Sequence, residues 1–448
     1  DKLTTTFTAG AAAAGIAGVG AGIVVQSVDT TNTAQLSGAA TVSSAALAIN
    51  AHTIHSLTAD TIVGAAGGFG LAAAVTYIED NSDTYAYING ATVSVSGGVA
   101  VNAISARTID ADATGVSLGL TGAAGVSYAE TSIGGETKAA LGSDASGATS
   151  NQGVNIGTSG NRTGSVTLGA TSTDSVLAET IAAGGGIGFA IQGAVADGDV
   201  VTTVATEMNN ANIYTANAIN SMASSNSAAT TDSTGVSISG GLAAGVSLAE
   251  SKLDVTVSNN VLGGSVLDGG SVSIGSEITR GRNDSDALAA AGALVGVAGS
   301  DAESDNTSSA ITTVSGSTIN SGGQVSITAA TSTEQTSKSS GLAIGLIAAG
   351  SNNALSKSNT ETITAVTNMN GITAGGLNIT STGDVKNYST AVAGSGGLVA
   401  GAASSSDTST TSRTEAYATT TGGAGNKYVI DVSTGLVDIN ATHTANFG

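Results

Sequence analysis

Carboxylates at alternate positions are the most conspicuous chemistry-bearing groups of the sequence. Because residues i and i+2 of a β-strand lie on one face, each set would present its carboxylates side by side. Such sets can act as acid and base in glycoside hydrolysis, or bind Ca²⁺. We favour a third interpretation, solvated acidic faces that keep an apolar fibre soluble and block lateral sheet pairing. The sets are Asp110/Asp112, Asp197/Asp199, Asp284/Asp286 and Asp301/Glu303/Asp305.

Calcium is the one cofactor that the sequence leaves open. Its candidate ligands are Asp301, Glu303 and Asp305, the longest of these sets. The sequence contains neither the 12-residue EF-hand loop nor the Gly-rich calcium-binding nonapeptide repeat. We therefore expect no resident cofactor and no metal site.

Three histidines, His52, His55 and His443, complete the candidates for chemistry. The spacing of His52 and His55 could hold a metal ion, but we favour solvated surface histidines. There is no Cys nucleophile, and a Ser/His/Asp triad needs a placed His that most of the chain lacks. No phosphate-binding loop, dinucleotide-binding turn or zinc-protease motif stands out. The sequence predicts no catalytic residues and no enzymatic activity.

Composition excludes several classes of protein. The 448 residues include 64 Gly and no Pro, Cys or Trp, with 33 acidic and 12 basic residues and a net charge of −21. Without Cys, neither a disulfide scaffold nor a thiolate metal site can form. The negative charge argues against binding to nucleic acid or anionic membrane surfaces. A hydrophobic content of 41% is too high for a chain that stays disordered.

The absence of Pro indicates continuous β-pairing. Pro usually makes up about 5% of a protein. A chain that tolerates none is one in which nearly every backbone N–H is needed as a donor between strands. The alternative is a compositional bias of a chain rich in Gly, Ala, Ser and Thr.

Internal repeats support the same interpretation. The segment 114–131 recurs at 234–251, with an offset of 120 and no gap. A second marker, Gly followed by alternating apolar residues, recurs at intervals of 66, 106, 53, 53 and 59. These intervals predict eight units of roughly 53 residues. The marker begins at Gly98, Gly164, Gly270, Gly323, Gly376 and Gly435.

We therefore predict a single continuous domain over residues 1–448. An insertion near 142–164 accounts for the longer third repeat. The expected repeats span about 10–63, 64–114, 115–181, 182–234, 235–291, 292–340, 341–393 and 394–448.

Each repeat has the same internal order: a Gly/Ala-rich run, a Ser/Thr/Asn/Asp stretch, a turn and the marker. Apolar residues at i, i+2 and i+4, with many Thr, Val and Ile, are typical of strands. For the Gly/Ala runs, such as 10–25, two alternatives remain. A transmembrane helix would need roughly 20 apolar residues and basic flanks, and a soluble helix would pack through its small residues. We favour strands whose small side chains let neighbouring backbones approach closely.

Repeated strands that cannot bury their own apolar face stack on their neighbours, which predicts an all-β fold, a β-solenoid (β-helix). With equivalent strands about 4.8 Å apart, eight rungs of one repeat each would rise about 38 Å. Two coils per repeat would double this to about 77 Å. Because the marker occurs once per repeat, we favour one wide, flattened coil.

The marker Gly-Gly-x-Val-x-Ile, present at Gly269–Ile274 and Gly322–Ile327, resembles repeats of very large bacterial surface proteins. These are the leukotoxin-type filamentous adhesins and, more distantly, the filamentous-haemagglutinin-like β-helix proteins. The resemblance extends through the Gly/Ala runs along the whole chain but carries no catalytic motif. It implies a fibrous, secreted protein of the extracellular space or the cell surface.

The two ends of the sequence bear on assembly. Asp1-Lys2-Leu3 does not resemble the start of a signal peptide, and neither end shows the polar cap that solenoids usually carry. We expect either a segment of a longer array or subunits that stack end to end. The expected partners are therefore further repeats of the same chain, or other copies of itself in a fibre.

Two functions follow as hypotheses. The favoured one is a structural extracellular fibre or adhesin stalk, with cell-surface or matrix glycans as a further class of partner, no nucleic acid and no membrane insertion. An envelope or sheath component would differ only in lateral assembly. The alternative is a polysaccharide-binding or polysaccharide-cleaving β-helix protein. Such proteins usually line a groove with aromatic and basic side chains, whereas this chain has 3% aromatic residues and no Trp.

Overall fold

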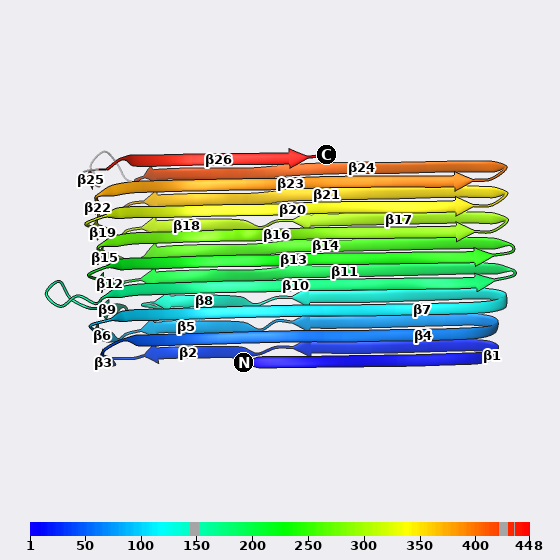
Figure 1. The fold of residues 1–448 in the computed structure, drawn as a ribbon, viewed down its shortest axis with the longest axis horizontal. Helices are drawn as coiled ribbons and strands as arrows, with labels where there is room; N and C mark the ends of the chain where they lie inside the picture. The colour runs from blue at the N-terminus through cyan, green and yellow to red at the C-terminus, as the bar shows by residue number, and fades with distance from the viewer. Residues whose placement is uncertain (144–151, 421–428, 434) are drawn as a thin grey trace.

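The structure is a computed structural model that describes residues 1–143, 152–420, 429–433 and 435–448. Within them the chain forms an all-β solenoid whose strands run back and forth and stack in chain order from the N-terminus to the C-terminus (Figure 1). Strands of successive coils pair in parallel. The all-β solenoid predicted from the repeats is confirmed.

One repeat makes one flattened coil, which we call a rung. In the fourth rung, β10 (Ser165–Gly186) runs to a bend, β11 (Phe189–Asn209) returns, and β12 (Ala211–Tyr214) closes the coil. The equivalent strand of the next rung, β13 (Ala218–Ser239), pairs with β10 at an offset of 53 residues. We call the face formed by β10 and its equivalents the first face, and the face formed by β11 and its equivalents the second face.

The other rungs repeat this arrangement. In the first three, one strand continues through the bend and belongs to both faces: β1 (Lys2–Val28), β4 (Leu47–Asp80) and β7 (Gly98–Ile133). The first face continues with β16 (Ser271–Gly292), β20 (Gln324–Ile344), β23 (Gly376–Gly396) and β26 (Val437–Phe447). The second face also contains β2 (Thr31–Ser37), β5 (Asp83–Asn89), β8 (Glu136–Leu141), β14 (Leu242–Leu262), β17 (Val295–Asn306), β18 (Ser309–Ser315), β21 (Ile347–Thr367) and β24 (Val399–Thr419). The short closing strands are β3 (Thr41–Ser44), β6 (Thr92–Val95), β9 (Val154–Ile156), β15 (Val266–Gly269), β19 (Thr318–Ser321), β22 (Gly371–Ala374) and β25 (Ile430–Val432).

The register also locates the longer third repeat. Most first-face strands are offset by 52 to 54 residues from the next one. Between β7 and β10 the offset is 67, so the extra residues follow β8 and precede β10. The expected insertion near 142–164 falls there, and its residues 144–151 lie outside the described residues.

The hydrophobic core lies at the edge of the solenoid that the short strands close. The marker side chains point inward there, and Val166, Leu168 and Ile274 are fully buried. Val166 stacks on Ile219 and Ile274 on Ile327 of the next rung, and Leu168 stacks on Val101 of the rung before. Complete burial of such a side chain contributes about 1.5–3 kcal/mol, so the markers stabilise the fold through repeated apolar ladders.

Toward the bend the interior becomes polar and then thin. Inward Ser and Thr side chains hydrogen-bond across the coil, as Thr76 does with Thr61 at 2.9 Å. Closer to the bend most inward residues are Gly and Ala, and a Cβ on Gly20 would lie 2.9 Å from the backbone oxygen of Gly64. The Gly/Ala runs therefore form the bend, where small side chains bring the two faces into close contact.

Even the turns hydrogen-bond from rung to rung. At the corner before the marker, the N–H of Gly97 donates to Ala45, and the N–H of Gly164 donates to Gly97, at 2.7 and 2.8 Å. The N–H of Asn217 donates in turn to Gly164 at 2.9 Å, and that of Gly270 donates to Asn217 at 2.6 Å. Proline at these positions would remove a donor and interrupt the ladder. This pairing gives a physical reason for the absence of Pro.

Candidate functional site: two carboxylate ladders

The register stacks carboxylates into a column on the outer surface of the first face. Asp112 of β7 lies between Asp60 of β4 and Glu179 of β10. Because equivalent strands are about 4.8 Å apart, these groups are closely spaced like charges. We call the column the first-face ladder. It consists of Asp60, Asp112, Glu179, Asp232 and Asp286, and ends at Lys338.

Like-charge stacking perturbs this ladder. Partial burial, reinforced by the carboxylates of Asp110 and Glu179, raises the pKa of Asp112 to about 7. Burial first, and neighbouring carboxylates second, also raise the pKa of Asp232. A carboxyl group that stays protonated next to an ionised one is the expected response when several acids share a small surface. Asp112 therefore holds its proton up to near neutral pH.

A second ladder lies on the second face. Asp197 of β11 stacks between Glu130 of β7 and Glu250 of β14, and Glu303 of β17 continues the column. Partial burial, followed by the charges of Asp199 and Glu250, raises the pKa of Asp197 to about 7. We call these four stacked carboxylates, Glu130, Asp197, Glu250 and Glu303, the second-face ladder.

The neighbouring column of the second face has alternating charge instead. Asp199 stacks on Lys252, Lys252 on Asp305, and Asp305 on Lys357. Each Lys therefore lies next to carboxylates of the adjacent rungs, which offsets part of the repulsion. The second-face ladder is the less strongly charged surface of the two for this reason.

The two ladders lie back to back. Thr61 follows Asp60 in β4, and Thr76 precedes Tyr77, which occupies the second-face column one rung below Glu130. The hydrogen bond between Thr61 and Thr76 crosses the interior, so both ladders are at the same distance from the bend. Both therefore mark the boundary between the core half and the thin half of each rung.

The calcium candidates lie on one outward side of β17, as strand alternation predicts. Asp301 accepts a hydrogen bond from Asn353 at 3.0 Å, and Glu303 pairs with Lys357. Within the residues that the structure describes, no group of three or more His, Asp and Glu side chains is placed to hold a metal ion. Calcium binding at Asp301, Glu303 and Asp305 stays a prediction.

The histidines do not form a common site. His52 is exposed on the first face, whereas His55 is buried, so the two side chains lie on opposite sides of β4. The interpretation of His55 as a solvated surface residue is wrong, because its Nδ1 lies 2.7 Å from Asp80 Oδ2 inside the coil. His443 is exposed and hydrogen-bonds to Ser412 at 2.8 Å.

A buried charged column accompanies His55. His55 stacks on Arg107 and Arg107 stacks on Asp174, all pointing into the solenoid. The guanidinium of Arg107 donates to Asp174 Oδ1 at 2.9 Å. Burial alone would raise the pKa of Asp80, but hydrogen bonds from His55 and Ser82, followed by the charge of Arg107, lower it below its usual value. These side chains neutralise one another in the core, so they have a structural role.

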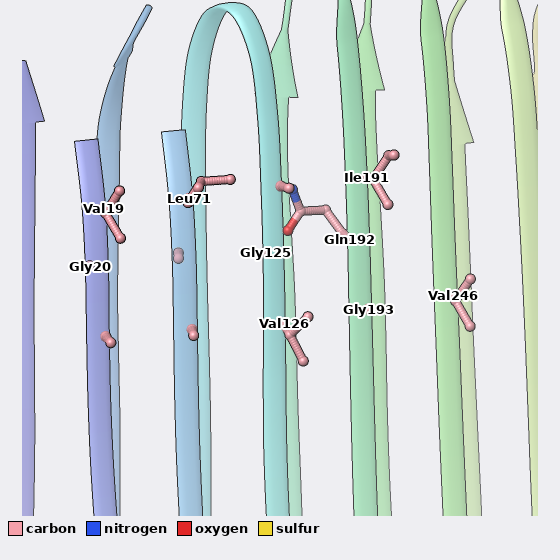
Figure 2. Close-up of a pocket in the computed structure, with 13 residues that line it drawn as sticks. Val19, Gly20, Leu71, Gly125, Val126, Ile191, Gln192, Gly193 and Val246 are labelled. Atoms are coloured by element: carbon pink, nitrogen blue, oxygen red, sulfur yellow. The ribbon is translucent and has the colours of Figure 1, made fainter. Parts of the chain in front are cut away.

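Beyond the ladders, the outer surface near the bend is apolar. A shallow groove of about 420 Å³ crosses the second face of the first five rungs. Figure 2 shows side chains of successive strands, among them Leu71, Val126 and Val246, along this groove. The thin half of the solenoid therefore carries its larger apolar side chains on the outside, opposite to the usual arrangement.

Comparison with known proteins gives no match. No family model matches the chain, and neither a curated protein nor a solved structure matches it. Among the described residues, no helix is long and apolar enough to cross a membrane.

Proposed function

We propose that this chain is a structural element of an extracellular fibre or adhesin stalk and has no enzymatic activity. The observation that supports it is the ladder of parallel backbone hydrogen bonds between successive rungs, which includes turns of the described residues. Such a ladder makes the backbone the working part of the molecule, since each rung is a template for the next. A further rung, from the same chain or from another copy, would pair in the same way.

The proposed relationship is with the leukotoxin-type filamentous adhesins, on the basis of the Gly-Gly-x-Val-x-Ile marker. The marker has a clear physical role, because its Gly residues make the corner and its apolar residues fill the core. A secreted protein at the cell surface would use such a rod for reach and stiffness, and cell-surface or matrix glycans are proposed partners. The exposed carboxylate ladders would keep the rod soluble.

The polysaccharide-cleaving alternative finds little support in the first-face ladder. A shallow hollow there contains Asp60, Asp112 and Glu179. Its other lining residues are Ile62, Thr114 and Ile181, so neither an aromatic platform nor a basic side chain faces the carboxylates. The raised pKa of Asp112 follows from stacking and burial, and does not by itself indicate an acid catalyst.

Fibre diffraction and electron microscopy of the purified chain test the proposal together. Oriented samples should give a meridional reflection at about 4.8 Å, and images should show plank-like rods. Globular particles without this reflection would contradict it. A screen of acidic and neutral polysaccharides for cleavage, with D112N as the matched control, should be negative. Cleavage that D112N abolishes would favour the enzyme instead.

A further inference from the structure

The apolar surface of the second face extends over six rungs. Between the bend and the second-face ladder, each strand has four outward positions, which on β11 are Phe189, Ile191, Gly193 and Val195. In the first five rungs none of these positions carries a charge, and Asp301 is the first charge in the sixth. Ile191 is 46% exposed. We call these four positions over rungs one to six the second-face apolar patch.

The two middle positions of the patch pair one large residue with one small residue on every strand. From rung two to rung six the sense of the pair reverses at each step, which produces projections and hollows in a checkerboard, whereas Val19 and Ala21 of rung one have the same sense as rung two. Figure 2 shows this stagger, with Leu71 and Ile191 displaced along the strands relative to Val126 and Val246. From rung two to rung four, the pairs are Leu71 and Ala73, Ala124 and Val126, and Ile191 and Gly193.

The next two rungs continue the alternation. Val246 on β14 is large where Ala244 is small, and Val297 on β17 is large where Gly299 is small. The projecting side chains Val246 and Val297 are 45% and 44% exposed. The pattern ends at β21, where both middle positions are small.

We propose that the second-face apolar patch is a dimer interface with a second copy of this chain. A two-fold axis parallel to the stacking direction, passing between the two middle positions, makes the patch complementary to itself. This axis places the two middle positions of a strand opposite each other, and the first position opposite the fourth, on the same strand of the other copy. Ile191 then enters the hollow at Gly193 of the partner subunit, and Val126 enters the hollow at Ala124 of the partner subunit.

The charges select this axis over the alternative. With the two-fold axis along the stack, the bends of the two copies point in opposite directions. Each second-face ladder, including Asp197 and Glu250, then lies opposite the bend of the other copy, at the rim of the interface and away from the other ladder. A two-fold axis along the strands would instead place one ladder against the other, which like-charge repulsion opposes.

The size of the patch matches a stable dimer. Four outward positions about 6.7 Å apart along a strand, over six rungs of about 4.8 Å, cover about 770 Å² on each copy. Specific protein–protein interfaces of standard size bury about 800 Å² per partner. The groove that crosses the patch is mostly apolar, as the centre of such an interface requires.

Filling one hollow tests the interface without disturbing the fold. Gly193 has an ordinary backbone conformation, and a Cβ added there would meet open space. Gly193→Leu should leave the circular dichroism spectrum and thermal midpoint of the protomer unchanged. Since the substitution occurs twice in a two-fold interface, it should weaken dimerisation about 100-fold or more.

Two further variants make the test specific. Ile191→Ala with Gly193→Leu restores one large and one small residue in the pair, so the dimer should return. Gly401→Leu adds the same side chain in open space on β24, outside the six rungs, and should have no effect. Sedimentation velocity over a concentration series measures all four proteins.

The sedimentation results distinguish the proposed dimer from the alternatives. A wild-type dimer near twice 42.4 kDa that G193L dissociates and the double variant restores supports the proposal. A wild-type protein that stays a folded monomer over a 100-fold rise in its concentration overturns the proposal. An assembly that G193L does not weaken also overturns it, because end-to-end stacking does not use this patch. Flotation of the monomer with neutral phosphatidylcholine vesicles would overturn it in favour of a lipid surface. Each result is independent of whether microscopy shows rods.

Discussion

Neutralising Asp112 should stabilise the solenoid. Asp112 is half-buried, with Asp60 and Glu179 one rung away on either side and Asp110 two positions away on the same strand. At about 4.8 Å in a water-like dielectric, each stacked neighbour costs about 0.9 kcal/mol when both groups are charged. Asp112→Asn removes both repulsions and keeps a group that can hydrogen-bond to Glu179. We expect the free energy of unfolding to rise by about 2 kcal/mol at alkaline pH and low salt.

The sign of the pH dependence follows from the raised pKa of Asp112, which is about 7 in the fold. An unfolded Asp has a pKa of about 3.9, so the folded chain binds this proton more tightly. The stabilisation by the bound proton is complete below pH 4 and is lost as the pH rises through about 7. The Asp112→Asn variant should therefore be more stable than the wild type at pH 9 and equally stable at pH 4.

Thermal melting by circular dichroism at pH 4 and pH 9, in low salt, measures the effect. For 448 residues, a gain of about 2 kcal/mol corresponds to a rise of about 2 °C in the melting temperature. Asp407→Asn is the matched control, since Asp407 is exposed and stacks on Leu355 instead of a carboxylate. No gain at pH 9, a gain that persists at pH 4, or an equal gain in the control would refute the reasoning.

Three further variants test the interior and the turns by the same melting assay. Arg107→Ala leaves Asp174 buried without its partner and should lower the free energy of unfolding by about 3–5 kcal/mol. Replacing both residues with Leu should recover most of this loss. Equal losses in the single and double variants would contradict the pairing. Ile274→Ala in a marker should cost about 2–5 kcal/mol through the cavity it creates, and a loss below 1 kcal/mol would contradict its place in the core. Asn217→Pro should cost about 3 kcal/mol because it removes a donor between rungs, while Asn217→Ala should cost far less; similar effects of the two would contradict the explanation for absent Pro.

The fold could be predicted because two signals report the same physics. Alternating apolar residues in the marker, such as Val272 and Ile274, indicate strands with one buried side. Recurrence of the marker at 53 residues indicates that identical strands stack, since like residues at about 4.8 Å build continuous apolar ladders. A single marker per repeat also favoured the single coil, which the register between Val272 and Val325 shows.

The carboxylate ladders were missed although their signal was present. Within one strand, the spacing of Asp110 and Asp112 was interpreted correctly as one outward face. The stacking partners, however, depend on the register between rungs. Asp60, Asp112 and Glu179 are separated by 52 and then 67 residues, which are the offsets of the strands themselves. Aligning all acidic residues on the marker would have revealed the first-face ladder.

The burial of His55 was missed for a different reason. Near the middle of each rung the interior contains many Ser and Thr side chains, with charged side chains in rungs two to four, so polarity no longer indicates which side faces water. His55 shares its side of β4 with the buried residues Leu57 and Ala59, and strand parity alone places it inside. The charge of Asp80 makes this possible, and that partner is 25 residues away in the sequence.

The strongest repeat in the sequence now acquires a physical meaning. Segments 114–131 and 234–251 lie two rungs apart, in rungs three and five. Stacking alone would make adjacent rungs the most similar, because like residues pack best on the next strand. Instead, the large residues Val126 and Val246 lie on either side of Gly193, the small residue at the same position of the rung between them. A period of two rungs, about 9.6 Å, also occurs inside the coil, where Gly125 and Gly245 leave room for the larger side chain of Gln192 between them. The outward residues of the same repeat space the projections that the proposed dimer requires.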